Sequence, residues 1–154
     1  MEDQKLSALV DNIISVKPLF YKTLGKPFPA NADITPGAYY IMLYLKKHES
    51  LSMSDLGKIM MVSKPNVTAL VNQLITKEFV IRFSNKLDRR IIMIRLSSKG
   101  NHFVDKNNQK YLNQLTKRLA SLTNDELELF SASLQNVKDI LSRIPICETP
   151  DCKK

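Results

Sequence analysis

The sequence predicts a mainly α-helical protein that carries one small antiparallel β wing. Apolar residues recur at helical spacing along most of the chain. Between residues 79 and 96 this pattern gives way to two short runs rich in β-branched and aromatic residues, separated by a charged loop, which is typical of two paired strands. A chain of 154 residues with 44% hydrophobic content is long enough to bury a core. It contains no apolar run of about 18 residues, so we expect no membrane-spanning helix.

Two short helices precede the predicted strands. The first covers Met53–Met60, and the second begins after Ser63, which is a good N-cap. Pro65 stands in the first turn of the second helix, where a missing amide donor does no harm. Met61 occupies the turn between the helices, a place where many helix-turn-helix units have glycine. Two helices at this spacing predict a helix-turn-helix.

The second of these helices has two contrasting faces. Val67, Leu70, Val71 and Leu74 form an apolar stripe at helical spacing. The opposite face carries short side chains that suit base edges in a major groove, namely Lys64, Thr68, Ala69, Asn72 and Gln73. We expect the two amides to bond adenine, and the threonine and alanine to meet thymine methyl groups.

The predicted strands, Phe79–Phe83 and Ile91–Leu96, flank the polar loop Ser84–Arg90 and form a hairpin. A hairpin placed directly after such a helix is a wing, which reaches phosphates or the minor groove beside the helix. Residues 51–100 hold nine lysines and arginines against three acids, which is +6 of the chain's net charge of +8. A basic lobe on a nearly neutral scaffold indicates a polyanion partner, whereas charge that only aids solubility would not concentrate there.

The wing carries a motif whose two halves stand five residues apart, Asp88-Arg89-Arg90 and Leu96-Ser97-Ser98-Lys99-Gly100. This motif resembles the wing signature of the multiple-antibiotic-resistance-repressor (MarR) family, and the resemblance extends over nearly the whole chain, to about Ile144. It implies a winged helix-turn-helix DNA-binding region over residues 31–100, with a weak third strand at Leu51–Met53. It also implies a helical dimerisation region formed by residues 1–30 and 101–146. Residues 147–154 are expected to form a flexible tail.

The resemblance also assigns roles within the wing. Arg90 is expected to enter a narrow, electronegative minor groove, and Asp88 to hold it by accepting a charge-assisted hydrogen bond from it. Arg89 and Lys86 are expected to contact phosphates. The predicted DNA-binding residues are Ser63, Lys64, Asn66, Thr68, Ala69, Asn72, Gln73, Lys86, Asp88, Arg89 and Arg90. The alternative for the wing is an ordinary solvated turn with an ion pair of little worth.

Both ends of the chain are predicted to contribute to a dimer. A helix over Asp3–Leu24, interrupted by Pro18, carries an apolar stripe, and a long helix runs from Ser97 to about Leu119. The last helix begins at a capping box of Thr123 and Glu126 and shows a strict heptad stripe, which needs a partner in the chain or in a second copy. We expect a two-fold dimer interface formed by Leu6, Leu9, Ile13, Leu127, Phe130, Leu134, Val137 and Leu141.

A further helix, opened by Thr35 as N-cap and Pro36, has the body Ala38–Leu45, which is apolar almost all round and therefore buried on most sides. Its tyrosines have two explanations, of which core packing is favoured. The alternative is the wall of a pocket for a small aromatic or lipophilic effector, where this helix meets the dimerisation helices. The pocket residues would be Phe20, Tyr39, Tyr40, Met42 and Tyr111.

No catalytic set emerges, because His48 and His102 lie in unrelated segments and no nucleophile elbow or Gly-rich phosphate loop is present. We expect no enzyme activity, no cofactor and no metal site. Cys147 and Cys152 have no neighbouring histidine and are expected to be free thiols without a redox role.

We therefore predict a cytoplasmic, homodimeric transcription regulator that binds a palindromic site in double-stranded DNA. In the resembling family such a protein is most often a repressor that a small-molecule effector releases. The alternatives are a winged-helix module that binds an acidic protein partner, and an architectural DNA binder that is indifferent to sequence.

Overall fold

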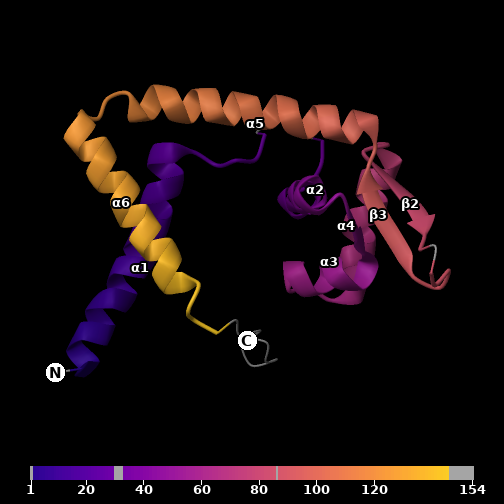
Figure 1. The fold of residues 1–154 in the computed structure, drawn as a ribbon, viewed down its shortest axis with the longest axis horizontal. Coiled ribbons are helices and arrows are strands. Elements are labelled where there is room, and N and C mark those ends of the chain that lie inside the picture. Colours follow the sequence, from indigo (N-terminus) through magenta and orange to yellow (C-terminus); the bar gives the residue numbers. More distant parts are fainter. Residues whose placement is uncertain (1, 30–32, 86, 146–154) are drawn as a thin grey trace. The chain divides into compact units, whose positions relative to one another are not determined.

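The computed structural model describes residues 2–29, 33–85 and 87–145. In chain order the elements are α1 (Glu2–Leu24), α2 (Pro36–His48), β1 (Ser50–Ser52), α3 (Met53–Met60), α4 (Lys64–Thr76), β2 (Val80–Ser84), β3 (Ile92–Leu96), α5 (Ser98–Leu119) and α6 (Asn124–Leu141) (Figure 1). The predicted fold class, mainly α with a small antiparallel sheet, is confirmed. The chain divides into two compact units, residues 1–114 and residues 115–154, with the boundary inside α5. Among the described helices, none has the length and apolar character needed to cross a membrane.

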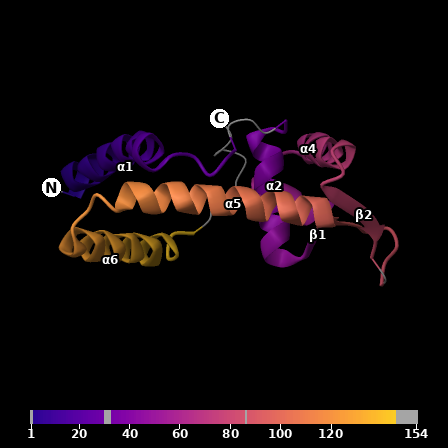
Figure 2. The same ribbon diagram turned by 90° about the horizontal axis from the view of Figure 1, so that it is seen from above.

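The strands form one antiparallel sheet in the order β1-β3-β2, with β3 in the centre. Leu51 of β1 lies opposite Ile94 of β3, and every residue of β2 also pairs with β3. The third strand expected at Leu51–Met53 is therefore present, but it ends at Ser52, because Ser52 is the N-cap of α3. The hairpin of β2 and β3 projects away from α2 in both ribbon views (Figures 1 and 2).

The hydrophobic core is built from one face each of α2, α3 and α4, together with the sheet and the start of α5. Its largest fully buried side chains are Tyr39, Ile41, Met42, Leu45, Leu56, Val67, Val71, Leu74, Ile94 and Val104. Burying one side chain of this kind contributes about 1.5–3 kcal/mol, so this cluster fixes the helices against one another. The predicted start of α2 is confirmed, because Thr35 Oγ1 accepts a hydrogen bond from the Ala38 N–H at 3.4 Å and Pro36 is the first helical residue.

Tyr39 belongs to this core. Its ring meets Phe28 and Phe103 edge-on, with ring centroids 5.8 and 6.2 Å apart, and its hydroxyl donates to Asn108 Oδ1 at 3.4 Å. Burial raises the pKa of this hydroxyl. Asn108, which interrupts the apolar stripe of α5, thus supplies the partner that a buried hydroxyl needs. Since Met42 is also fully buried, core packing accounts for two of the five residues proposed for an effector pocket.

The second half of the wing motif builds the junction between β3 and α5. Ser97 caps α5, because its Oγ accepts from the Gly100 N–H at 3.0 Å and donates to the Glu78 carbonyl at 2.6 Å. Gly100 lies against the carbonyl of Phe79, where an added Cβ would be 2.0 Å from the oxygen. The glycine is therefore required by the close approach of two backbone segments.

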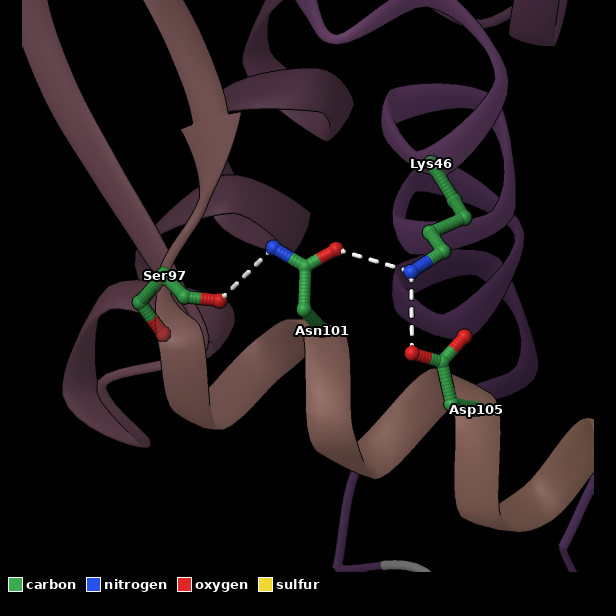
Figure 3. A network of polar contacts seen from close by, with 4 residues as sticks. All are labelled: Lys46, Ser97, Asn101 and Asp105. Atoms are coloured by element: carbon green, nitrogen blue, oxygen red, sulfur yellow. Dashed lines mark hydrogen bonds and ion pairs between the residues drawn. The ribbon is translucent and has the colours of Figure 1, made fainter.

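Polar contacts then hold the first turns of α5 against α2 (Figure 3). Lys46 Nζ of α2 donates to Asn101 Oδ1 at 3.1 Å and to Asp105 Oδ2 at 2.9 Å. Asn101 Nδ2 in turn donates to the Ser97 carbonyl at 3.1 Å. The Lys46 and Asp105 side chains are 37% and 59% exposed, so the ion pair is worth at most about 1 kcal/mol and serves mainly to orient α5.

Neither α1 nor α6 contains a buried residue among those described, and many of their apolar side chains are exposed. The prediction that Pro18 interrupts the helix is wrong, because α1 is continuous through this residue. A helix that lacks one backbone hydrogen bond at a proline can continue on both sides of it. The capping box of α6 is confirmed, and Glu126 Oε2 accepts from the Thr123 N–H at 2.8 Å, which lowers the pKa of that carboxyl. The helix ends at Leu141.

Gly100→Ala is expected to destabilise the fold by about 1–3 kcal/mol or more. The new methyl would collide with the Phe79 carbonyl, which is held in place by the Ser97 N–H at 3.0 Å. Gly37→Ala is the matched control, because its Cβ would meet only the flexible end of Leu70 at 3.3 Å and helix propensity favours alanine by about 1 kcal/mol. Urea unfolding of both variants measures the difference, and equal stability would contradict the close approach at Gly100.

Candidate nucleic-acid interface

The turn between α3 and α4 closes on a left-handed residue. Met61 has φ 51° and ψ 38°, and the next residue, Val62, donates its N–H to the Gly57 carbonyl at 3.2 Å. The turn therefore keeps the conformation that glycine adopts easily, although the residue here is methionine. That conformation costs a residue with a side chain about 1–2 kcal/mol. The core that holds α3 and α4 together maintains it.

α4 begins at the predicted position, but the predicted N-cap residue does not form the expected hydrogen bond. Ser63 is the N-cap residue, yet its hydroxyl makes no capping hydrogen bond. One reason is that Pro65, in the second helical position, has no N–H to donate. Three members of the predicted apolar stripe of α4, Val67, Val71 and Leu74, are fully inaccessible, whereas Leu70 is only half-buried. The helix therefore turns its opposite face to solvent.

The predicted DNA-contacting residues of α4 differ in exposure. Ser63, Lys64, Asn66, Ala69 and Asn72 are exposed, whereas Thr68 and Gln73 are half-buried. The Thr68 hydroxyl donates to the Lys64 carbonyl at 3.0 Å, within the helix. We call these exposed residues the α4 face, and one of them, Asn72, contacts β2 of the wing.

Gln73 lies at the edge of this surface and contacts α2. Its Oε1 accepts hydrogen bonds from the backbone N–H and the hydroxyl of Thr35, at 3.2 and 3.0 Å. Thr35 is the N-cap of α2, so Gln73 joins the start of one helix to the side of another. This contact occupies the carbonyl oxygen that was predicted to contact adenine.

Arg82 was not identified from the sequence, yet it contacts the α4 face. It lies on β2, and its Nη2 donates to Asn72 Oδ1 at 2.9 Å. Alternation along the strand explains the contact, because Arg82 shares a face with Val80, which is buried in the core. That alternation is the signal in the sequence from which Arg82 could have been identified.

Side chains that accept hydrogen bonds from nearby backbone amides shape the wing loop. Asp88 Oδ1 accepts from the backbone N–H of Arg90 at 2.9 Å, and Asn85 Oδ1 accepts from the N–H of Leu87 at 2.8 Å. The bond between Asp88 and Arg90 is present, but its donor is the Arg90 main chain rather than its guanidinium. Leu87, which the sequence did not single out, is 98% exposed at the tip. Lys86 lies outside the described residues.

The wing arginines carry charge that no neighbouring carboxylate neutralises. Within the described part of the chain, Arg89 and Arg90 are exposed and form no ion pair. Other bases of residues 51–100 are occupied, since Lys77 pairs with Asp33 and Lys99 Nζ lies 2.9 Å from Glu78 Oε2. The bond from Lys99 lowers the pKa of the Glu78 carboxyl. The positive charge left without an ion pair therefore includes both arginines of the wing, Arg89 and Arg90.

The chain is similar to known proteins in sequence. Residues 34–92, from just before α2 to the first residue of β3, match a family model described as the MarR family. The transcriptional repressor MdtR of Bacillus subtilis is 31% identical over 100 residues. That match covers 64% of this chain and 63% of the repressor, so it spans less than two thirds of the relative's length.

Solved structures share the fold over most of the chain. The transcriptional regulator BldR from Sulfolobus solfataricus is 27% identical, with a TM-score of 0.65 over 92% of this chain and 97% of BldR. A MarR mutant from E. coli, complexed with operator DNA, is 21% identical, with a TM-score of 0.57 over 88% of this chain and 95% of its own. At that identity the second likeness shows the fold alone.

Met61→Gly is expected to stabilise the protein by about 0.5–1 kcal/mol. Glycine removes about 1–2 kcal/mol of strain in the left-handed turn, and its greater freedom in the unfolded chain takes back about 0.5–1 kcal/mol. Little packing is lost, because the Met61 side chain is 58% exposed. Lys58→Gly, inside α3, is the control and should destabilise by about 1 kcal/mol. Thermal unfolding of both variants measures the contrast, and a less stable Met61→Gly protein would refute the strain.

Proposed function

We propose that this chain is a DNA-binding transcription regulator of the MarR family, and that it is a repressor that binds a palindromic operator as a homodimer. One observation carries the DNA-binding part of the proposal. α4 buries its apolar stripe and leaves the polar α4 face exposed beside a wing with two unpaired arginines, Arg89 and Arg90. Members of this family are regulators of transcription rather than enzymes.

In this proposal α4 enters the major groove. Asn66, Ala69 and Asn72 are exposed and of the right size to reach base edges, while Lys64 contacts a phosphate near the start of the helix. Thr68 contributes at the rim of the same surface. Gln73 acts instead as a brace for α2, because Thr35 occupies its carbonyl oxygen.

The wing supplies the second contact. Arg90 enters a narrow minor groove, where A·T-rich sequence concentrates negative potential, and Arg89 contacts phosphate. Asp88 shapes the turn that presents Arg90, by accepting its backbone N–H at 2.9 Å. The negative charge of the Asp88 carboxylate would by itself repel DNA. Asp88 therefore favours binding through the shape that it gives the turn.

The homodimer is supported by apolar surface that a single chain leaves exposed. On α1, Leu6, Leu9 and Ile13 are more than half exposed, and on α6 Val137 and Leu141 are equally open. A surface of this kind on two helices fits a large apolar interface between identical chains. Such a dimer would present two α4 helices to half-sites about one helical turn apart.

A small aromatic or lipophilic effector would act on the regulator in the cytoplasm, where it meets DNA. Tyr40 is exposed, and Phe20 and Tyr111 are half-buried, so these three remain accessible members of the suggested pocket. Release of bound DNA by small aromatic acids, scored by fluorescence anisotropy, tests this part.

A selection from a random DNA pool tests the function as a whole. The regulator should enrich a palindrome, and log affinity for the selected site should fall steeply and linearly with log salt. A winged-helix module for an acidic protein partner would show neither result. An architectural binder would show the salt dependence without enriching a sequence, which the polar, non-basic α4 face argues against.

Replacing both Leu134 and Val137 by Asp should yield monomers or insoluble protein and abolish operator binding. Both side chains lie on the heptad stripe of α6, and buried charge there would prevent apolar contact between two copies. Leu129→Asp is the matched control, because Leu129 is 69% exposed but lies off the stripe. Sedimentation measures the mass of each protein. A well-folded wild-type monomer at micromolar concentration would overturn the dimer.

The contacts of the wing predict different effects for its charged residues. Arg90→Ala should weaken binding most at sites with A·T-rich flanks, by about 1–3 kcal/mol. Arg89→Ala should weaken all sites alike and lower the salt slope by roughly one. Binding of both variants to sites with A·T-rich and G·C-rich flanks separates these effects.

Two changes at Asp88 separate geometry from charge. Asp88→Asn keeps an oxygen that can accept the Arg90 N–H, so operator affinity should be kept or rise as a negative charge is lost. Asp88→Ala removes the acceptor and should weaken binding by about 1 kcal/mol. Tighter binding by Asp88→Ala would show that the turn does not depend on this hydrogen bond.

A further inference from the structure

We propose that Arg82 is a positioning residue that sets which end of the Asn72 amide faces DNA, and that it thereby excludes cytosine at the base that Asn72 contacts. This inference rests on the proposed function, because it requires α4 to enter the major groove. The contact joins Arg82 of the wing strand β2 to Asn72 of the α4 face.

The geometry joins the two elements directly. Arg82 follows Val80 on the face of β2 that packs toward α4, and Val80 is buried there. Two residues further along the strand this face has left the core, so the Arg82 side chain lies at the surface. Its Nη2 donates to Asn72 Oδ1 at 2.9 Å. Asn72 is itself exposed, so the pair stands on the surface proposed to meet DNA.

The chemistry of the pair allows only one orientation of the amide. A guanidinium carries N–H donors and no acceptor, so the amide oxygen of Asn72 must face Arg82. The other end, Nδ2, then turns away from the wing with two N–H donors. Because the arginine is charged, the hydrogen bond is stronger than one between neutral groups, and it resists rotation of the amide.

An amide that presents donors selects bases by their acceptors. In the major groove guanine offers N7 and O6, adenine offers N7, and thymine offers O4. Cytosine offers only the N4 amino group, which is a donor. Asn72 held in this orientation therefore accepts three bases and rejects the fourth. Without Arg82 the amide can rotate, so that Oδ1 accepts from cytosine N4.

The test compares site selection from a random DNA pool by the wild-type protein, by Arg82→Met and by Arg82→Lys. Methionine keeps much of the side-chain length without a donor, and lysine keeps both the charge and a donor for Asn72 Oδ1. The wild type should reject cytosine about five- to tenfold at one position per half-site. Arg82→Met should reduce this to less than about twofold, and Arg82→Lys should largely restore it. Because Arg82 is exposed, neither change should disturb folding, which thermal unfolding verifies.

Two further variants separate positioning from simple phosphate contact. Arg95→Met is the matched control, because Arg95 is also basic and on the sheet but lies over the Phe83 ring at 5.5 Å, away from Asn72. It should leave the base preference unchanged. Asn72→Ala should remove the preference, and adding Arg82→Met to it should change the profile no further.

Two outcomes count against the inference, and they differ. If Arg82→Met weakens every site equally and cytosine stays excluded, Arg82 contacts only phosphate and the positioning role is wrong. If the wild-type protein enriches no sequence at all, the proposed function fails first, and the inference fails with it.

Discussion

The orientation of the α4 face, the surface that we propose meets DNA, depends on the burial of one apolar stripe on α4. Val67, Val71 and Leu74 are fully inaccessible. Exposing any one of them would cost about 1.5–3 kcal/mol, so the rotation of the helix about its axis is fixed. Helical geometry then directs Ala69 and Asn72 to the opposite side, whatever their chemistry. The fold therefore sets where the exposed residues point, while their identity remains open to selection for a DNA sequence.

The features that the sequence predicted correctly are those decided by neighbours along the chain. Thr35 and Thr123 cap helices because a hydroxyl reaches a backbone N–H three residues on, and this depends on local residues alone. The apolar stripe of α4 follows from spacing in the same way. Pro18 and Ser63 are exceptions. Sequence alone does not say whether a helix continues past the hydrogen bond that a proline lacks, and the Ser63 hydroxyl makes no capping hydrogen bond although Ser63 is the N-cap of α4.

The sequence did not predict contacts between residues that lie far apart along the chain. It also did not distinguish whether the main chain or the side chain of a residue donates a hydrogen bond. Gln73 lies 38 residues from Thr35, and no helical pattern predicts that its carbonyl oxygen is occupied there. Arg82 meets Asn72 only because β2 packs beside α4. Asp88 was correctly linked to Arg90, but a bond to the main chain and a bond to the guanidinium have the same sequence signal. If α4 and the wing meet DNA as proposed, these three contacts decide which polar groups remain available to it.

The winged region and the terminal helices differ in how they are stabilised, and this bears on how a regulator of this kind works. The winged region has its own buried core, which includes Tyr39 and Ile94. α6 has 18 residues and no buried side chain among those described, and helix propensity alone seldom holds such a segment in water. Its capping box helps only at the first turn. We therefore expect the order of α6 to depend on a surface that covers its apolar stripe. If that surface is a second copy of the chain, as proposed, a weakened dimer would lose the terminal helices first and leave each winged region folded. Specific binding to the operator would then fail because the two winged regions, although still folded, are no longer joined.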